Sequence, residues 1–407
     1  MKIQLHWKIF IGLCLGFCLG LLSRLLGFES FVQNSISVIG EIFLRCLRMI
    51  IIPLITVSIV SSVASISSGE CFGRLSIKTF VYYVSTSLFA IVTGLILVNI
   101  IMPGKGAQLG LQAVPNEVPA QVEKLGELLL NIIPINPFAA LAKGDIVPII
   151  FFSLLFGFFI TKAPDPAKTY LRTFFDAAFN VMMLLTHFII QFTPLGVFAL
   201  LADITARSGF EVFIPLGRYM LTVALGLSLH ACITLPVLLF LLGRAKPIKH
   251  FRAVSGALMT AFSTASSSAT LPLTLESVRE NDGVSDNVSG FVLPLGATIN
   301  MDGTALYECV AAIFIAQAYG IDLTFFQQFL VVLTALLASI GAAGIPMAGL
   351  VMIAVILRAV GLPLEGMGLI LAVDRILDMM RTSVNTWSDT CGAVIIARTE
   401  GETTLKV

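Results

Sequence analysis

The last long apolar segment of the chain, residues 365–397, contains five ionisable side chains between Asp374 and Asp389. At about 100° per residue, the polar residues of this helix fall on one stripe. The stripe consists of Asp374, Asp378, Arg381, Thr382, Asn385 and Asp389. A charge at the centre of a bilayer costs about 2.5 to 3.5 kcal/mol, so this face cannot contact lipid. The helix must turn its polar face toward protein, water or a charged solute.

The charge balance of the stripe separates two interpretations. A structural ion-pair seam between helices needs balanced charge, but here the carboxylates outnumber the arginines. Thr382 and Asn385 add neutral donors and acceptors to the same face. We therefore favour a polar binding site for a charged solute and its ions, with the ion-pair seam as the alternative.

The composition sets the class of protein. With 57% hydrophobic and 12% charged residues, the chain has about half the charge of a soluble domain, as expected for a polytopic membrane protein. Its net charge of +1 gives no basic surface for nucleic acid. We expect its partners to be membrane lipid and small solutes.

Hydropathy predicts eight transmembrane helices, because eight apolar segments are long enough to cross a bilayer. These spans are 8–26, 36–66, 79–102, 128–162, 173–202, 211–243, 288–318 and 365–397. Basic residues gather in alternate loops, near 74–78, 162–172 and 244–252. Positive charge favours the cytoplasmic side, so we expect both termini in the cytoplasm. The basic, apolar N-terminus lacks a cleavage site, which favours a retained first helix over a signal peptide.

Two further apolar segments, 253–280 and 323–360, are too broken to be simple spans. Each has a cluster of small residues followed by proline, Pro272 in the first and Pro346 in the second. This pattern favours two re-entrant helical hairpins, with flexible interfacial loops as the alternative. An acid-bearing span follows each hairpin, so hairpin plus helix forms an internal repeat of the kind that encloses a transporter's site.

The seventh span is interrupted by residues 300–304, Asn-Met-Asp-Gly-Thr. Asn, Asp and Gly disfavour a continuous helix, and a break would expose backbone carbonyls beside the Asp302 carboxylate. Oxygen ligands suit a hard cation, and sodium is the natural candidate. The alternative is a capped kink without an ion. Tyr83, Thr86 and Ser87 of the third span are weak ligand candidates alone and gain weight only beside this break.

Glu308 lies on the same helix among apolar neighbours. An isolated carboxyl in such surroundings favours its neutral form, so it is a candidate to bind and release a proton. The alternative is a carboxyl that stays protonated and hydrogen-bonded.

The sequence contains no phosphate-binding loop, zinc-protease motif or G-x-S-x-G motif. The serines at 266–268 have no nearby histidine, since His250 falls in a predicted basic loop. We therefore expect no enzymatic activity and no organic cofactor, which leaves ion gradients as the energy source.

Several motifs resemble those of the dicarboxylate/amino acid:cation symporter family, in particular its glutamate and aspartate transporters. They are SSSATLP (266–272), GATINMDGTALYE (296–308), SIGAAGIPMAGL (339–350) and DRILDMMRTSVNTWSD (374–389). FLRCLRMIIIPL (43–54) and NPF (136–138) extend the resemblance over nearly the whole chain.

The resemblance implies an all-α homotrimer that works as an elevator-type transporter with inverted repeats. Residues 1–74 and 118–206 would form a scaffold from spans one, two, four and five. Residues 75–117 and 207–407 would form the transport domain from spans three, six, seven and eight and both hairpins. The second hairpin would act as the gate.

The resemblance also implies the binding residues. Arg381 would hold the side-chain carboxylate of the substrate, a role suited to its two-pronged guanidinium, and Asp378 would accept from the ammonium. Asn385 and the Ser266–Ser268 tip would hold the α-carboxylate. The implied substrate set is Ser266, Ser267, Ser268, Thr304, Gly349, Asp378, Arg381, Thr382 and Asn385.

The family pattern further implies three sodium sites and a proton site. The first sodium site maps to Gly296, Asn300, Asn385 and Asp389. The second maps to Thr298, Met301, Ser339 and Ile340, and the third to Tyr83, Thr86, Ser87, Asn300 and Asp302. Glu308 falls where relatives that co-transport a proton carry their acid.

The chain departs from the family pattern at several positions. Relatives usually place a second arginine at the position of Ala265 or of Met379, and this chain has neither. Arg375 is the candidate substitute, but pairing with Asp374 or Asp378 is favoured slightly. Ser388 and Met347 replace other residues that are usual in relatives, so gating kinetics are expected to differ.

The leading hypothesis is a sodium-driven symporter for L-glutamate or L-aspartate, with protons as a second coupling ion. A C4-dicarboxylate carrier would not need Asp378, and a neutral amino acid carrier would not need Arg381. An anion-conducting channel is the alternative from another class. Short external loops without a glycosylation sequon favour a multi-pass protein of the bacterial inner (plasma) membrane.

Overall fold

The protein is described here from a computed structural model. It covers residues 5–64, 70–107, 133–144, 146–208, 213–341, 348–371, 373–403 and 405–407. Every regular element within these ranges is a helix, which confirms the predicted all-α class. The second-hairpin tip, including Met347, lies outside the described residues.

Among its described residues, the first half of the chain has seven α-helices longer than three residues. In order, the elements are α1 (Leu5–Leu26), α2 (Glu29–Phe31), the π-helix η1 (Val32–Ile36), α3 (Ser37–Ala64), α4 (Glu70–Ile101), α6 (Pro137–Lys143), α7 (Ile146–Lys162), α8 (Ala167–Ile190) and α9 (Thr193–Ser208).

The second half is more finely divided. Its elements are α10 (Phe213–Leu229), the π-helix η3 (His230–Thr234), α11 (Leu235–Gly243), α12 (Pro247–Thr264), α13 (Ser267–Ser277), the π-helix η4 (Val278–Asp282), α14 (Asp286–Ile299), α15 (Asp302–Ala318), α16 (Phe325–Gly341), α17 (Ala348–Val360), the 3₁₀ helix η5 (Leu364–Gly366), α18 (Met367–Leu371) and α19 (Asp374–Thr399).

Among the described residues, three helical stretches are long and apolar enough to cross a membrane by length and composition. They are 74–101, 214–243 and 286–318, and shorter apolar helices accompany them. The predicted span 173–202 is wrong as a single helix, because α8 ends before Gln191 and Pro194 cannot continue it. The predicted span 128–162 is divided at Gly144, which ends α6 in the left-handed conformation, at φ 78°. The total of eight spans stays a prediction.

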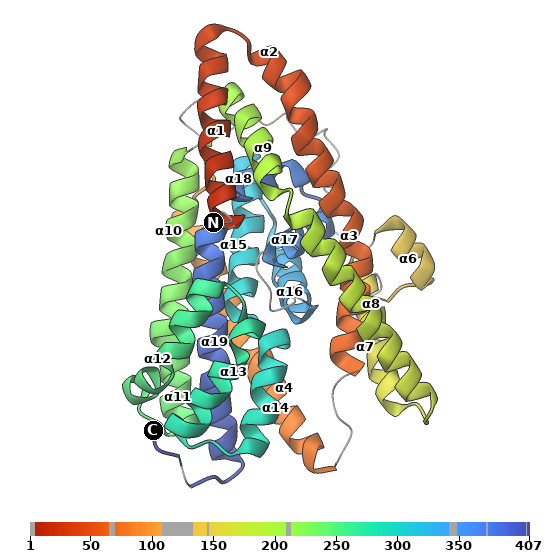
Figure 1. The fold of residues 1–407 in the computed structure, drawn as a ribbon, viewed down its shortest axis with the longest axis vertical. Helices are drawn as coiled ribbons and strands as arrows, with labels where there is room; N and C mark the ends of the chain where they lie inside the picture. The colour runs from red at the N-terminus through yellow and green to blue at the C-terminus, as the bar shows by residue number, and fades with distance from the viewer. Residues whose placement is uncertain are drawn as a thin grey trace.

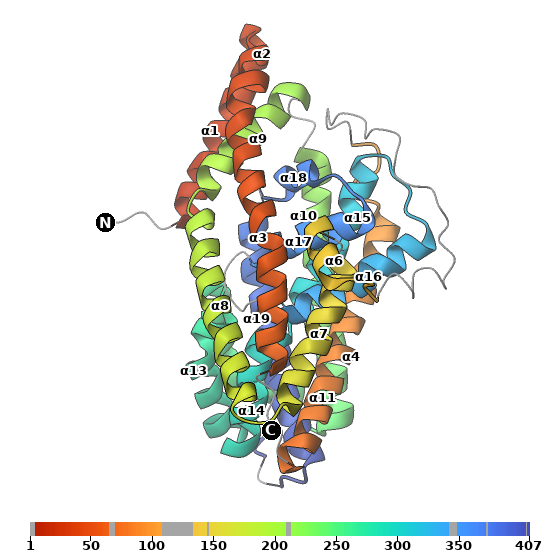
Figure 2. The same cartoon turned by 90° about the vertical axis from the view of Figure 1, so that its right-hand side faces the viewer.

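Two groups of helices lie side by side in Figure 1. One contains α3 packed against α7, α8 and α9, with α1 along α9. The other gathers α10 to α15 and α19 together with α4, which packs on α10 and α15 although it comes from the first half of the chain. Figure 2 shows the same grouping after a quarter turn. The division into scaffold and transport domain stays a prediction at this point.

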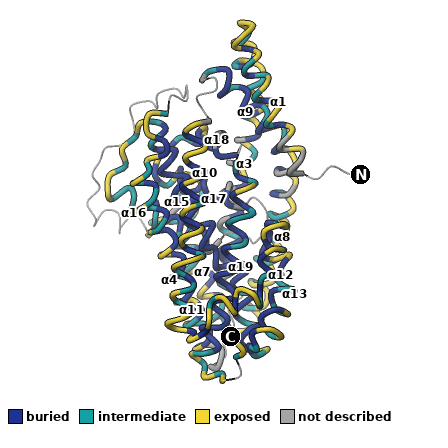
Figure 3. The backbone as a smooth tube through the Cα atoms, turned by 90° about the vertical axis from the view of Figure 1, so that its left-hand side faces the viewer, coloured by how far each residue is buried: buried dark blue, intermediate teal, exposed yellow. Residues whose placement is uncertain are grey.

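The two broken apolar segments form pairs of packed helices, α12 with α13 and α16 with α17. The first pair turns at Ala265, a non-glycine residue in the left-handed region, with φ 50°. The predicted interruption of the seventh span is also present, because Asn300 and Met301 have non-helical backbone angles between α14 and α15. Helix α15 and most of α19 are buried, as the dark blue tube in Figure 3 shows.

Candidate functional site

The polar stripe of α19 faces the interior of the molecule, as predicted. Its six side chains are at most 6% exposed. Helices α11, α12, α14 and α15 pack around α19 and cover most of it. The members of the stripe divide into two clusters, one around Asp302 and the other around Arg381.

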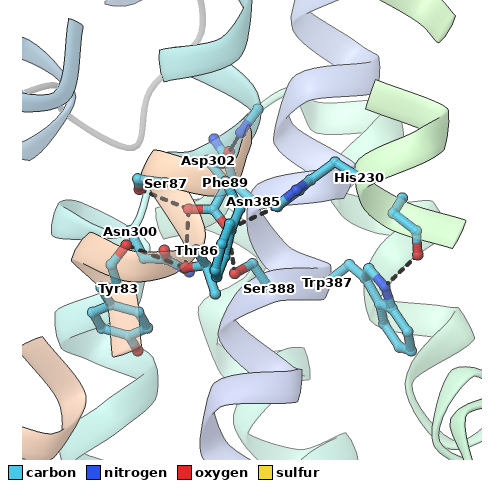
Figure 4. A network of polar contacts seen from close by, with 12 residues as sticks. Tyr83, Thr86, Ser87, Phe89, His230, Asn300, Asp302, Asn385, Trp387 and Ser388 are labelled. Atoms are coloured by element: carbon cyan, nitrogen blue, oxygen red, sulfur yellow. Dashed lines mark hydrogen bonds and ion pairs between the residues drawn. The ribbon is translucent and has the colours of Figure 1, made fainter. Parts of the chain in front are cut away.

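Asp302 is the centre of the first cluster, and both of its carboxylate oxygens have hydrogen-bond partners. One carboxylate oxygen accepts from Ser87 Oγ at 2.7 Å and from Thr86 Oγ1 at 3.2 Å. The other accepts from Ser388 Oγ at 2.6 Å and lies 3.1 Å from His230 Nε2. Figure 4 shows these side chains converging from four different helical segments. A buried carboxylate is tolerated here because every side of it meets a hydrogen-bonding group.

Two local irregularities position this cluster. The break at Asn300 and Met301 ends α14 and starts α15 at Asp302 itself. On another element, the π-helix η3 begins at His230, whose side chain reaches Asp302. Both features interrupt regular α-helix at the point where polar groups meet, as functional sites in membrane helices often do.

Asn300 links the break to the end of the stripe. Its Nδ2 donates to Asp389 Oδ1 at 2.8 Å, while its own Oδ1 is buried without a partner among the described residues. The Tyr83 hydroxyl donates nearby to Val292 O at 2.7 Å. Gly296 has to be glycine for space, because a Cβ there would lie 2.4 Å from Asp389 Oδ1 and 2.6 Å from the Tyr83 hydroxyl. Oxygen atoms from three elements therefore crowd one small buried volume.

Arg381 is the centre of the second cluster. Its Nη2 lies 2.9 Å from Asp378 Oδ1 and 3.1 Å from Asp374 Oδ1. The guanidinium lies over the Tyr307 ring, 3.8 Å from its centroid, and the Tyr307 hydroxyl donates to Asp374 at 2.6 Å. The arginine is thus held by two carboxylates and a ring face, which together offset much of the cost of burial.

Some donors and acceptors in this cluster are left unused. Arg381 Nε and Nη1 and Asp374 Oδ2 are buried without a hydrogen-bond partner among the described residues. Gly349 of α17 lies directly against the guanidinium, because a Cβ there would be 2.3 Å from Arg381 Nη1. Both oxygens of the fully buried Glu308, on the neighbouring α15, also lack a partner in the described structure.

Asn385 lies between the two clusters. Its Oδ1 accepts from Gly303 N at 2.8 Å, and its Nδ2 donates to Thr304 Oγ1 at 3.2 Å and to Met301 Sδ at 3.2 Å. Thr382 donates to the Asp378 carbonyl at 2.9 Å. The structure therefore joins the predicted residues of α15 and α19 in one connected region.

The hairpin residues are less closely joined to this region. Ser266 caps α13, with its Oγ accepting from Ala269 N at 3.2 Å, and α13 packs against α19. Ser267 is buried and Ser268 is exposed. Of the second predicted sodium set, Thr298 and Ser339 donate to carbonyls of their own helices at 3.0 Å and 2.9 Å. That set stays a prediction, as does the role of the Ile340 carbonyl.

Arg375 lies near Asp378, with Nη1 and Oδ2 separated by 3.8 Å, so the favoured pairing is confirmed at long range. The expectation that His250 lies in a basic loop is wrong. His250 is buried in α12, stacks on Trp387 with ring centroids 4.9 Å apart, and lies 3.0 Å from Asp282 Oδ2. Pro247 starts α12 before it, so the basic run continues into a helix.

Three residues of the site did not follow from the sequence pattern: His230, Ser388 and Tyr307. His230 is an ionisable residue inside an apolar span, which is a usable signal for a functional position. Ser388 stood out only as a departure from related sequences. Tyr307 had no signal, because an aromatic residue on a buried helix is most often core.

The comparisons with known proteins agree with this geometry. A family model described as the sodium:dicarboxylate symporter family matches residues 5–399. The proton/sodium-glutamate symport protein of Geobacillus stearothermophilus is 38% identical, over 98% of this chain and 96% of that protein. The proton/glutamate-aspartate symporter of Escherichia coli is 34% identical, over 98% and 94%. Human excitatory amino acid transporter 3 is 36% identical, over 88% and 78%.

Proposed function

The chain belongs to the sodium:dicarboxylate symporter family, and we propose that it is a secondary transporter that takes up L-glutamate or L-aspartate. As a member of a symporter family it is a membrane transporter and not an enzyme. The substrate, the coupling ions and the assembly are the points that the proposal adds.

The observation that carries the substrate proposal is the Arg381–Asp378 pair. These side chains are buried and 2.9 Å apart, and Arg381 keeps two nitrogen atoms without a partner among the described residues. An acidic amino acid brings a carboxylate for the guanidinium and an ammonium for Asp378. It therefore replaces one internal ion pair by two intermolecular pairs and keeps the site balanced in charge.

A plain dicarboxylate does not satisfy this arrangement. Succinate offers two carboxylates and no donor, so its arrival would leave Asp378 facing a like charge. A neutral amino acid would leave Arg381 buried without an anionic partner beyond Asp374. Asn385, Thr304, Thr382, Gly349 and the Ser266–Ser268 tip complete the proposed substrate pocket.

Sodium is the proposed coupling ion, and its proposed ligands are oxygen atoms. Asn300 Oδ1 is a buried acceptor without a partner in the described structure, as an ion ligand would be before the ion binds. It lies between the Asp302 cluster and Asp389, where two of the three proposed sites meet. We assign these two sites to Tyr83, Thr86, Ser87, Asn300 and Asp302, and to Gly296, Asn300, Asn385 and Asp389. The third set is Thr298, Met301, Ser339 and Ile340.

Glu308 is the proposed proton carrier. It is fully buried and neither carboxyl oxygen has a partner in the described part of the chain, so the ionised form is costly. The Geobacillus stearothermophilus protein that is similar to nearly the whole of this chain is named a proton/sodium-glutamate symport protein. We therefore propose that Glu308 crosses the membrane protonated.

The proposed assembly is a homotrimer in the bacterial inner membrane with cytoplasmic termini. Residues 1–74 and 118–206 form the proposed scaffold, and residues 75–117 and 207–407 the moving transport domain of an elevator. The packing of α4 onto α10 and α15 supports placing 75–117 with the second half. The second hairpin, α16 and α17, is the proposed gate.

The test is uptake of radiolabelled substrates into proteoliposomes, with sodium and pH gradients imposed separately. Aspartate or glutamate uptake should follow an inward sodium gradient and should not be inhibited by succinate. Uptake of succinate without aspartate would overturn the amino acid assignment. If a sodium gradient drives no uptake while an inward proton gradient does, the sodium assignment is overturned and Glu308 is left as the only coupling site.

A further inference from the structure

The face of α19 opposite the polar stripe borders an apolar hollow. At about 100° per residue, Ser383 and Trp387 point away from Arg381 and Asp389, and Val384 lies at the edge of the same face. With α11, α12 and η3, they enclose an open cavity of about 400 Å³. Figure 4 shows Trp387 turned away from the Asp302 cluster, toward the backbone of the neighbouring helix.

The walls of the hollow are built and held in place. Cys232 and Pro236 form one side, Pro247, Phe251 and Leu258 the other, and Trp387 the floor. Trp387 Nε1 donates to Ala231 O at 3.0 Å, and Ser383 Oγ donates to Leu258 O at 3.3 Å. These bonds satisfy polar groups of the floor and tie it to both walls, so the space offers an almost wholly apolar lining.

Four basic residues lie in the sequence close to Pro247, the wall residue at which α12 begins, and Lys246 directly precedes it. Arg244, Lys246, Lys249 and Arg252 are exposed there, within the segment that joins α11 to α12 and the first turns of α12. The described part of the chain gives none of these four an acidic partner. The Lys249 ammonium donates to the Lys406 carbonyl, which leaves its charge in place. The interior of the hollow is therefore apolar, and exposed basic residues flank its Pro247 end in the sequence.

We propose that this hollow binds one anionic phospholipid of the cytoplasmic leaflet, with an acyl chain against Trp387 and the headgroup phosphate at Arg244 and Lys246. From Pro247 to Leu258, α12 rises about 16 Å, close to half of a bilayer core of about 30 Å. The lining residues of α12 thus extend over a length close to that of one leaflet. Basic clusters at the cytoplasmic ends of membrane helices attract anionic headgroups. The proposal does not depend on which solute is transported.

Tryptophan fluorescence tests this proposal directly. The chain has two tryptophans, so Trp7→Phe leaves Trp387 as the only one. This variant is reconstituted into phosphatidylcholine vesicles with increasing amounts of a lipid whose acyl chains are brominated, either phosphatidylglycerol or phosphatidylcholine. Brominated phosphatidylglycerol should quench Trp387 at a mole fraction about 30-fold lower, the preference expected from the two basic side chains Arg244 and Lys246 acting on the headgroup.

Two matched pairs of variants, made on the Trp7→Phe chain, separate headgroup from hollow. Arg244→Gln with Lys246→Gln should abolish the preference for phosphatidylglycerol, whereas Lys162→Gln with Lys168→Gln, in another basic loop, should keep it. Cys232→Phe should fill the hollow and reduce quenching by both lipids, whereas Ile233→Phe, one residue away and exposed, should not. Equal quenching by the two lipids, or a preference that survives the Arg244 and Lys246 changes, would overturn the proposal.

Discussion

The two clusters on the interior face of α19 differ in how completely their polar groups are bonded. Asp302 is within hydrogen-bond distance of three hydroxyls and an imidazole. A few turns away, Glu308 has no partner and Arg381 leaves two nitrogens unpaired within the described structure. Both regions are buried, so solvent does not explain the difference.

The contrast indicates which groups the fold itself completes and which are left for a ligand. A buried polar group without a partner costs about 1 to 3 kcal/mol, and more if it is charged. A chain keeps such groups only where something else completes them. The Asp302 cluster is therefore preorganised by the protein, whereas the Arg381 and Glu308 region has polar groups left over for the proposed substrate and proton.

The largest effect should come from Arg381→Cys. Removing the guanidinium takes away the partner proposed for the substrate's carboxylate and removes the close cationic partner of the buried Asp374 and Asp378. Loss of one partner of a buried charge pair costs about 2 to 5 kcal/mol, so aspartate affinity should fall at least 30-fold. Calorimetric titration with aspartate measures it. Arg375→Cys is the control, since its contact with Asp378 is long at 3.8 Å and a much smaller loss is expected. Retained aspartate affinity in Arg381→Cys removes this residue from the site.

The next effect should come from Asp302→Asn, which tests the completed cluster. Asparagine keeps the shape but turns one acceptor into a donor that faces Ser388 Oγ or Ser87 Oγ. We expect the sodium concentration for half-maximal uptake to rise about tenfold or more, with a lower thermal unfolding temperature. Asp322→Asn, on an exposed loop, serves as the control. Unchanged sodium dependence would show that the cluster is structural only.

Glu308→Gln should have a narrower effect. Glutamine has nearly the same shape and cannot carry a proton, so the uptake that an inward proton gradient adds should disappear. Sodium-driven uptake and aspartate binding should persist. The measurement is uptake at equal sodium on both sides, with and without an imposed pH gradient. A proton-driven component equal to that of the unmodified protein contradicts the assignment of Glu308.

The smallest effect should come from Glu400→Gln, which changes a salt bridge near the surface instead of a buried cluster. Just after α19, its carboxylate accepts from Lys78 and Arg74 at 2.6 Å each, and these hydrogen bonds hold the pKa of Glu400 below its ordinary value. A group whose pKa is lowered on folding stabilises the folded state at pH values above its unfolded-state pKa. This stabilisation is lost as the pH falls through the folded-state pKa. Glu400→Gln should therefore lower the free energy of unfolding by less than about 1 kcal/mol at pH 7, and by progressively less below about pH 4. An equal effect at pH 7 and pH 3 would show that charge is not involved.

The sequence predicts the polar interior better than the elements that surround it. The stripe of α19 follows from helical periodicity and the cost of charge in lipid, and the break at Asn300 from residues that disfavour a helix. The divisions at Gly144 and before Pro194 involve residues that often occur inside membrane helices, so hydropathy alone joins the flanking segments.

The individual contacts of the site were harder to predict. That His230 reaches Asp302 depends on a π-helix, and no composition signal distinguishes five residues of π-helix from α-helix. The position of His250 against Trp387 depends on how α12 packs on α19, which is a long-range contact. Local pattern fixes which face of a helix is polar, but the partner across that face comes from the tertiary fold.

The most direct test of the account is whether sodium controls substrate binding. Aspartate binding to the purified protein is titrated by calorimetry in sodium chloride and in choline chloride at the same ionic strength. If Asn300 links the proposed sodium sites to Asn385 and Arg381, aspartate should bind at least about tenfold more tightly in sodium chloride than in choline chloride. Sodium should in turn bind more tightly when aspartate is present. Equal aspartate affinity in the two salts would contradict a sodium-coupled symporter.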